Sequence, residues 1–333
     1  MEHTKPSIVK RIFAKRGMGQ VVTVFFGLIV LCLVFNFINP NFLGARNIGN
    51  LLRQFAPYLI VGIGQSFVLI TGNIDLSIGS VLGMSCMTSA TLMCNGWHPL
   101  AACLLTMVIC LFTGFINGTL VAGCKLPPFI ATLGTMQVAR GVAQMVNNNM
   151  NTNSIGEMAG AFRDFFYYEK FLTIYNTFWI ALVVWLVFNF ILSQTRTGRH
   201  LYAIGSNIDA AKLSGVSVYW TTTKAYLVSS ACAGLVGLIQ CATTGTGTMD
   251  AGMSYEMYAV AASVIGGVST LGGQGILLGT VVGAGVWSVL SNGLQFAGVA
   301  VGPRNVIIGV IVVLSVLADV VARSGRFSRK PKS

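Results

Sequence analysis

The chain has 333 residues, of which 54% are apolar and 9% charged, and its formal net charge is +12. A soluble domain carries about 25% charged residues, so this composition excludes a chain that faces water over most of its length. In a membrane protein a net positive charge indicates cytoplasmic segments that are rich in lysine and arginine. No stretch resembles a nucleic-acid-binding module, so no nucleic acid partner is expected.

Apolar segments that approach the roughly 20 residues needed to cross a bilayer recur along the chain. Ten of them lie near residues 20–38, 55–71, 76–94, 99–122, 128–147, 171–193, 220–242, 255–272, 274–296 and 304–322. Glycine and serine dilute the third, eighth and ninth. The sequence therefore predicts an all-α polytopic membrane protein with about ten transmembrane helices, whose main surroundings are membrane lipid.

Lysine and arginine are concentrated before the first segment, after the last segment and in the loop at 194–219. Cytoplasmic segments carry most of these residues in membrane proteins, so we expect both termini and this loop in the cytoplasm. The chain then divides into a basic N-terminus (1–19), a transmembrane domain (20–322) that contains the loop, and a basic tail (323–333).

The eight cysteines lie singly within apolar segments, and the three histidines are far apart in sequence. We interpret the cysteines as small packing residues and expect no metal site and no cofactor bound by this chain. The longest expected external loop, roughly 148–170, is rich in asparagine and ends in aromatic residues. It is either a solvated loop with an interfacial aromatic belt or a docking surface for an external partner.

An internal repeat is indicated by one offset of 175 residues, which needs no gap. It aligns Gly62 with Gly237, Gln65 with Gln240, Asp75 with Asp250, and Asn117 with Asn292. In the expected topology the two aspartates lie on opposite sides of the membrane, so segments 2–5 and 7–10 would form an inverted repeat. In transporters built this way the pathway lies at the interface between the repeats.

Residues 71–80 join the second and third segments without a proper loop. Glycine and Asn73 suit the end of one helix, and Asp75 with Ser77 suits the start of the next. In lipid such a break must be buried in protein or line a watery path. Two interpretations stay open: Asp75 caps a helix at the interface, or it lines a gate or pathway.

Other polar residues inside the apolar segments are also candidates. Asn117 and Asn292 each end a segment, where hydrogen bonding between helices is the structural alternative. Arg140 is the only basic residue well inside a segment; it either faces the protein interior, where it could neutralise an acid or contact a polar substrate, or lies near the external interface. The candidates for the pathway or gate are Asn73, Asp75, Ser77, Asn117, Phe129, Arg140, Asp250, Glu256 and Asn292.

The 194–219 loop contains the longest polar stretch with helix-capping residues. Asn207 can cap a helix, Asp209 suits its first turn and Gly215 can end it. A short, capped, basic helix outside the lipid offers a docking site to a soluble partner. The alternative is an amphipathic helix that lies on the membrane surface.

Four stretches carry a resemblance to a known family: 72–80, 128–136, 197–216, and 264–269 with 272–275. The chain resembles the membrane subunits of bacterial ABC importers for monosaccharides, the ribose/xylose/galactose permease group, over about 40–322. The resemblance implies a type II ABC importer-like fold in the bacterial inner membrane. It also implies a second permease copy (a homodimer or a related permease), separate cytoplasmic ABC ATPase subunits, and a periplasmic or tethered sugar-binding protein. It assigns ATPase coupling to Ser206, Asn207, Asp209, Ala210, Ala211, Lys212, Ser214 and Gly215.

The sequence departs from the family pattern at two places. Asn73 replaces the glycine that is usual in the Gly-Gly-Ile-Asp motif. After Tyr255 and Glu256, where the family commonly has leucine and an acidic residue, this chain has Met257 and Tyr258. The second departure lies on the expected external side, so it bears on the identity of the substrate or on the fit to the binding protein.

The resulting prediction is a permease subunit that translocates a monosaccharide, either a pentose or a hexose. The chain has no Gly-x-x-x-x-Gly-Lys-Ser/Thr phosphate loop, so we expect no enzyme activity here and ATP use by the partner subunit. One alternative is an ion-coupled secondary transporter of a small polar solute, with Asp75, Asp250 and Glu256 as coupling acids. Another is a membrane scaffold that binds a partner through the 206–215 helix.

Overall fold

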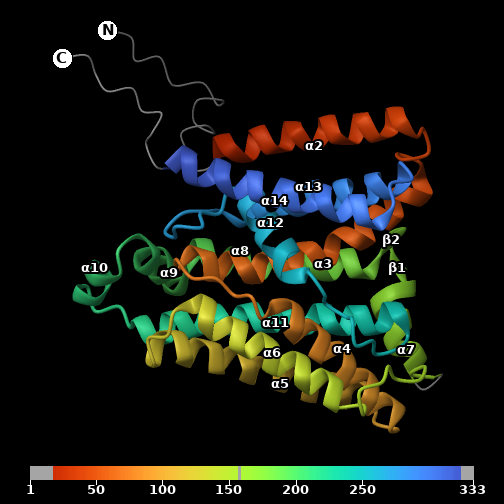
Figure 1. The fold of residues 1–333 in the computed structure, drawn as a ribbon, viewed down its shortest axis with the longest axis horizontal. Coiled ribbons are helices and arrows are strands. Elements are labelled where there is room, and N and C mark those ends of the chain that lie inside the picture. The colour runs from red at the N-terminus through yellow and green to blue at the C-terminus, as the bar shows by residue number, and fades with distance from the viewer. Residues whose placement is uncertain (1–17, 157–158, 324–333) are drawn as a thin grey trace.

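The computed structural model describes residues 18–156 and 159–323, and most of these residues are helical (Figure 1). The predicted basic N-terminus lies outside the described residues except for Met18 and Gly19, and the predicted basic tail lies outside them except for Arg323.

The first half contains α2 (Met18–Ile38), α3 (Ala45–Ile70), α4 (Ile78–Cys94), α5 (Pro99–Gly118) with the π-helical turn η1 (Thr119–Gly123), and α6 (Pro128–Met145). The segment between the two halves contains α7 (Gly160–Arg163), η3 (Asp164–Tyr168), and the antiparallel pair β1 (Lys170–Phe171) and β2 (Ile174–Tyr175). The second half contains α8 (Asn176–Gln194), α9 (Arg196–Ser206), α10 (Ile208–Leu213), α11 (Val218–Thr244), α12 (Tyr255–Ile265), α13 (Leu277–Phe296) and α14 (Val301–Arg323).

Each of the ten predicted segments overlaps one of the longer helices. Five of these helices are long and apolar enough to cross a membrane: α2, α5 with η1, α8, α11 and α13. The prediction of an all-α membrane protein is therefore confirmed, while the count of ten spans stays a prediction.

The helices differ from the prediction most at three places. Helix α12 ends at Ile265 and not near 272, because Gly267 adopts a left-handed conformation (φ 89°) that ends the helix. Eleven residues of helix extend only about 16 Å, which is half of the roughly 30 Å hydrocarbon core. Helix α3 begins ten residues earlier than expected, at Ala45. The 194–219 loop holds two helices, α9 and α10, where one was expected.

The helices form an inner group and an outer group. In the most apolar stretch of α11 and of α13, 72% of residues are buried, against 11% in α2 and 17% in α8. Outward side chains such as Phe26 of α2, Leu104 of α5 and Phe190 of α8 are exposed and apolar, as expected where helices meet lipid.

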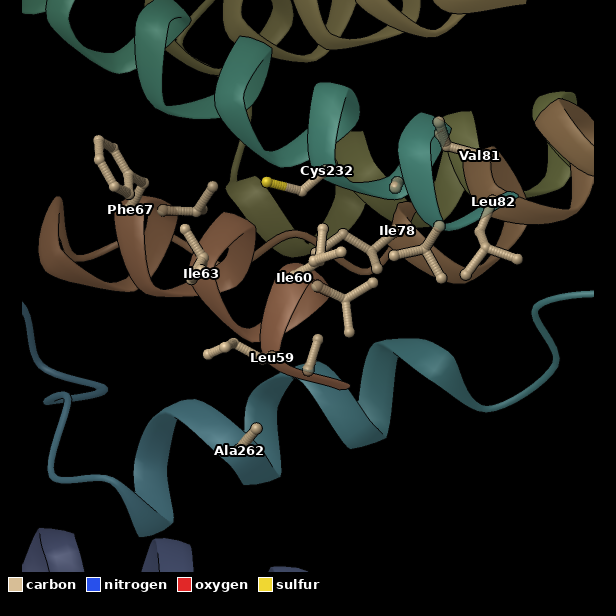
Figure 2. Packing of buried hydrophobic residues seen from close by; sticks show 14 of the residues in the cluster. Leu59, Ile60, Ile63, Phe67, Ile78, Val81, Leu82, Cys232 and Ala262 are labelled. Carbon is tan, nitrogen blue, oxygen red and sulfur yellow. The ribbon is translucent and has the colours of Figure 1, made fainter. Parts of the chain in front are cut away.

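The two central helices, α3 and α11, each pack against two other long helices. Helix α11 packs against α4 and α5, and α3 packs against α12 and α13, while α3 and α11 also touch each other. Their shared core includes Ile60 and Ile63 of α3, Leu82 of α4 and Cys232 of α11 (Figure 2). Helices α9 and α10 lie at one end of the molecule, and α7, β1 and β2 lie at the other (Figure 1).

Close contact between α4 and α11 depends on Gly237. A methyl group at this position would collide with the carbonyl oxygen of Leu82 and with the side chain of Ser85. Gly237→Ala is expected to force the two helices apart and to destabilise the protein by about 1–3 kcal/mol. The measurement is the thermal midpoint of the purified protein in mild detergent.

Gly141→Ala in α6 is the matched control, because nothing lies within 4 Å of a methyl group built there. The control should be as stable as the parent or slightly more stable, since alanine favours a helix over glycine. Equal thermal midpoints for both variants would contradict this account of the packing.

Candidate functional site

Asp75 lies in the break between α3 and α4, and its side chain is fully buried. Its Oδ1 accepts hydrogen bonds from the backbone N–H of Ser77 (2.9 Å) and from Ser77 Oγ (2.6 Å). Its Oδ2 accepts a hydrogen bond from Ser229 Oγ of α11 (2.7 Å). Both carboxyl oxygens are thus bonded, and the break is attached to the middle of α11.

Two further helices join this arrangement. Asn117 Nδ2 of α5 donates to Ser77 Oγ (2.8 Å), and Thr135 Oγ1 of α6 donates to Asn117 Oδ1 (2.6 Å). The Tyr226 hydroxyl of α11 donates to the carbonyl oxygen of Ile74 (3.1 Å). We name Asp75, Ser77, Asn117, Thr135 and Ser229 the Asp75 node. The structure therefore brings together three predicted residues (Asp75, Ser77 and Asn117), and it buries them in protein.

The N-termini of α4 and α12 meet in the interior. A methyl group at Gly79, in the first turn of α4, would collide with Glu256 Oε2 and lie 2.5 Å from the carbonyl oxygen of Gly252. Because Asp75 bonds Ser229 near the middle of α11, both helices begin inside the protein and not at its ends. Helices that begin at the midplane between repeats form the binding regions of many transporters.

Arg140 of α6 lies one turn further along α4. Its Nη1 donates to the carbonyl oxygens of Met249 (3.0 Å) and Ala251 (2.8 Å), and it would lie 2.8 Å from a methyl group on Gly83. Arg140 is thus half-buried and is directed at α4 and at the segment 249–251. The Glu256 carboxylate lies against Gly79 and the Arg140 guanidinium lies against Gly83. These positions are about 6 Å apart along α4, so two side chains of opposite charge pack on this helix one turn apart.

Within the described chain, the remaining pathway candidates form no hydrogen bond to the Asp75 node, although Asp250 lies between the two residues whose carbonyls Arg140 bonds. Asp250 is exposed, Phe129 is 57% exposed, and Asn73 Nδ2 donates to Thr71 Oγ1 (2.8 Å). Asn292 of α13 accepts a hydrogen bond from Asn47 Nδ2 of α3 (3.0 Å), which is the interhelical role considered for it. Asp75 and Asp250, although aligned by the 175-residue offset, have different surroundings.

The local structure expected around Asn207 is present. Asn207 Oδ1 accepts hydrogen bonds from the N–H groups of Asp209 (3.0 Å) and Ala210 (2.9 Å), and Gly215 follows α10 with φ 78°. Of the predicted coupling residues only Ala211 is buried. Between them α10 also presents Leu213, an apolar side chain that is 90% exposed.

A contact between three glycine-containing segments fixes α9 to the rest of the protein. A methyl group at Gly205, in the last turn of α9, would collide with the carbonyl oxygen of Ile70. The N–H of Gly273 donates to that same carbonyl (2.9 Å), and a methyl group on Gly272 would lie 2.8 Å from Gly205 O and 2.9 Å from the Cα of Gly72. We name Gly72, Gly205, Gly272 and Gly273 the glycine junction.

Tyr202 of α9 strengthens this contact, because its hydroxyl donates to the carbonyl oxygen of Gly275 (2.6 Å). Burial raises the pKa of Tyr202 to about 12, so the hydroxyl keeps its proton at neutral pH. The glycine junction was not predicted. Its members lie within the motif stretches 72–80, 197–216 and 272–275, but only the fold reveals that these stretches touch.

Removing the acceptor at the Asp75 node should be costly. Asp75→Ala leaves the donors of Ser77 and Ser229 without a partner in the protein interior, each at about 1–3 kcal/mol. We expect a loss of several kcal/mol, seen as a lower thermal midpoint and a lower yield from membranes. Ser229→Ala should cost less, because it removes one donor.

Ser193→Ala is the control for the serine, since Ser193 is exposed and bonds only the Asn189 carbonyl of its own helix. It should match the parent protein. An Asp75→Ala variant with parental stability would show that the node does not hold the break in place.

Known proteins that this chain resembles are named as permeases of transport systems. A family model described as "branched-chain amino acid transport system / permease component" matches residues 47–316. The ribose import permease protein of Bacillus subtilis (strain 168) is 35% identical over 91% of this chain and 94% of its own length. The D-allose transport system permease protein of Escherichia coli (strain K12) is 33% identical, over 89% of this chain and 90% of its own length. The galactose/methyl galactoside import permease protein of Haemophilus influenzae is 32% identical, over 89% and 93%.

No solved structure matches the chain. The relatives are named as permease proteins, so the prediction of a transport subunit and not an enzyme is confirmed. The match covers most of the chain, including the Asp75 node, the glycine junction and α10. The chain therefore belongs to the family of transport-system permease components.

Proposed function

We propose that this chain is the membrane subunit of an ABC importer that carries a monosaccharide, powered by ATP hydrolysis on a separate subunit. The observation that carries the proposal is the near full-length similarity to permeases named for ribose, allose and galactose. The family description names branched-chain amino acids, but the matching relatives above are all named for sugars.

The surface of α10 is the proposed docking site for the ATPase subunit. Asp209 and Lys212 form an exposed ion pair (3.6 Å) beside the exposed Leu213. An apolar side chain with charged neighbours on a short rigid helix suits insertion into a protein groove. The residues proposed for coupling remain the eight predicted between Ser206 and Gly215, of which Ala211 is the buried one.

The topology follows from the same proposal. Helix α2 begins and α14 ends at the same end of the molecule as α9 and α10 (Figure 1), which supports cytoplasmic termini and ten spans in a bacterial inner membrane. The external segment with α7, β1 and β2 then faces the sugar-binding protein. A second permease copy completes the translocation pathway.

The inverted repeat of spans 2–5 and 7–10 is supported by the packing. Under the proposed repeat, α3 corresponds to α11, α4 to α12 and α5 to α13. Helix α11 packs against α4 and α5. As this correspondence requires, α3 packs against α12 and α13. Both α4 and α12 also begin in the interior after an irregular segment. This correspondence was found in the fold and is independent of the residue matches that suggested the repeat.

We propose that movement of α10 reaches both repeats through the glycine junction. Helix α10 follows α9 directly, and Gly205 contacts Ile70 at the end of α3 and Gly273 in the loop between α12 and α13. From Ile70 the chain reaches Asp75 within five residues. A displacement of α9 would therefore act on the starts of α4 and of α13 together.

The ion-coupled alternative finds less support. Its coupling acids would be Asp75, Asp250 and Glu256, but Asp250 is exposed and Asp75 is bonded to serine donors inside the node. The acids do not form one connected group in the part of the chain that the structure describes.

Gly205→Ala tests the coupling role of the glycine junction. Overpacking of this kind costs about 1–3 kcal/mol, and such a cost in one conformation shifts a two-state equilibrium about tenfold or more. We expect sugar uptake by reconstituted complexes to fall accordingly, while the ATPase stays bound and hydrolyses ATP. Tyr202→Phe removes one hydrogen bond and should have a smaller effect in the same direction.

Gly134→Ala in α6 is the control, because a methyl group there has nothing within 4 Å. It should leave uptake unchanged. If Gly205→Ala transports as well as this control, the junction is not part of the coupling path.

The substrate class is tested by uptake in cells that lack the gene and in cells that regain it. Labelled ribose, allose, galactose and leucine form the panel. We expect restored uptake of at least one sugar, lost on ATP depletion and resistant to an uncoupler. Restored uptake of leucine alone would overturn the sugar assignment, and uptake that collapses with the uncoupler but survives ATP depletion would restore the ion-coupled alternative.

A further inference from the structure

Helix α6 turns two amide side chains away from its own protein. The residues that it buries lie along one side of the helix: Ala131, Thr132, Thr135, Ala139 and Ala143. Gln137 and Gln144 lie on the opposite side, because an α-helix turns by about 100° per residue. Gln137 is exposed and Gln144 is half-buried. The two amides therefore occupy the centre of the outward face of α6.

Helices α5 and α8 show what a lipid-facing surface of this protein contains. The exposed residues of α5 between Leu100 and Phe115 are all apolar, and so are those of α8 between Asn176 and Leu192. Gln137 is the tenth of the 18 residues of α6, so it lies far from both ends of its helix. Helix α6 is also not among the five described helices that are long and apolar enough to cross a membrane. Its outward face is therefore poorly suited to lipid.

The space in front of this face is open. Gly141 lies between the two glutamines on the same side of the helix, and a methyl group built there would have no other part of the protein within 4 Å. Arg140 lies one turn from each glutamine, at the edge of the face nearer to α4, where its guanidinium lies against Gly83. The two amides and the guanidinium therefore border one open polar surface.

An outward polar face within a membrane has to meet water or protein, because in lipid its amides would lose the hydrogen bonds that they make in water. In the function proposed above, a second permease copy completes the translocation pathway. A surface that this copy turns outward, and that lipid does not suit, can border that pathway. A primary amide offers two donors and an acceptor, which matches sugar hydroxyl groups that both donate and accept.

We propose that the outward face of α6 lines the sugar pathway, and that Gln137 and Gln144 form hydrogen bonds with the hydroxyl groups of the passing sugar. The inference rests on the proposed function, and it names residues that distinguish one sugar from another. The two glutamines are about 10 Å apart along the helix. In the proposed topology Gln144 is nearer the external end, so an imported sugar meets Gln144 before Gln137.

The decisive variant is Gln137→Met, which keeps the length of the side chain and removes its hydrogen-bonding atoms. In the complete complex with its ATPase and binding protein, we expect sugar uptake per folded complex to fall roughly fivefold to tenfold, because one hydrogen bond to the substrate is lost. The thermal midpoint should stay at the parental value, since Gln137 is exposed and its replacement leaves no buried group without a partner. Gln144→Met should lower uptake in the same way.

Gln295→Met is the matched control, because Gln295 is also exposed but lies in the last turn of α13. It makes the same chemical change away from α6 and should leave uptake at the parental value. Parental uptake by Gln137→Met would overturn the proposal. Loss of the second permease copy from the Gln137→Met complex in mild detergent would also overturn it, because the amide would then join the two copies and not bind the sugar.

Thiol labelling tests independently whether the face meets water. Gln137→Cys is made in a chain that carries Cys94→Ser and Cys124→Ser, which remove the two exposed native thiols, and the chain without Gln137→Cys gives the background. A charged, membrane-impermeant thiol reagent attacks the thiolate, which forms in water and not in lipid. We expect labelling above the background that slows when the sugar is in excess. A thiol that stays unlabelled in the nucleotide-free and the ATP-bound complex would place this face in lipid or in a dry contact, against the proposal.

Substrate selectivity separates a sugar contact from a general loss of activity. The parent complex should take up its sugar faster than the deoxy analogues of that sugar, and Gln137→Met should reduce this ratio for the analogue that lacks the contacted hydroxyl. An unchanged ratio for every analogue would show that the amide reads no hydroxyl group. Failure of the parent complex to take up any sugar would instead contradict the proposed function, so the two failures are distinguishable.

Discussion

A broken helix inside a membrane must satisfy its free polar groups within the protein, because lipid offers no hydrogen bonds. The Asp75 node does this for the break between α3 and α4. Donors from Ser77 and Ser229 converge on one carboxyl group, and Asn117 and Thr135 extend the chain of bonds to α5 and α6. The interior start of α4 depends on this node, and so does the meeting of α4 with α12.

The rest of the arrangement connects this node to the surface of the molecule. The α3 segment that leads into the break is held by the glycine junction, where the backbones of three distant segments touch. Such contacts leave no space for a side chain, so a displacement of one segment displaces the segments packed against it. The exposed helix α10 lies at the outer end of this path, and the Asp75 node lies at the inner end. In the function proposed above, this path is the route by which ATP hydrolysis on a separate subunit would act on a pathway inside the membrane.

Hydropathy and capping patterns predicted much of the fold. The ten apolar segments overlap helices, and the cap at Asn207 and the end at Gly215 follow from local chemistry. The early end of α12 was missed because apolar residues continue past Gly267, while the backbone does not stay helical. The bend between α9 and α10 was missed because one helix and two short helices have similar polar patterns.

The candidate site was predicted only in part, because its contacts join residues far apart in sequence. Asp75 and Ser77 were singled out as a local motif, but their bonds to Ser229 and Asn117 depend on tertiary packing. Asp250 was selected by alignment with Asp75, yet it is exposed. The glycine junction could not be recognised at all, because its significance lies in the close approach of backbones from distant segments. Such an approach is not visible in a sequence.

In the proposed function this chain moves a sugar with energy supplied by a separate ATPase. The most direct measurement is uptake of labelled sugar into proteoliposomes that contain this chain, its ATPase and its binding protein, with either ATP or an ion gradient as the only energy source. We expect accumulation with ATP and none with proton or sodium gradients, and loss of accumulation when the ATPase cannot hydrolyse ATP. Accumulation driven by an ion gradient without ATP would contradict it.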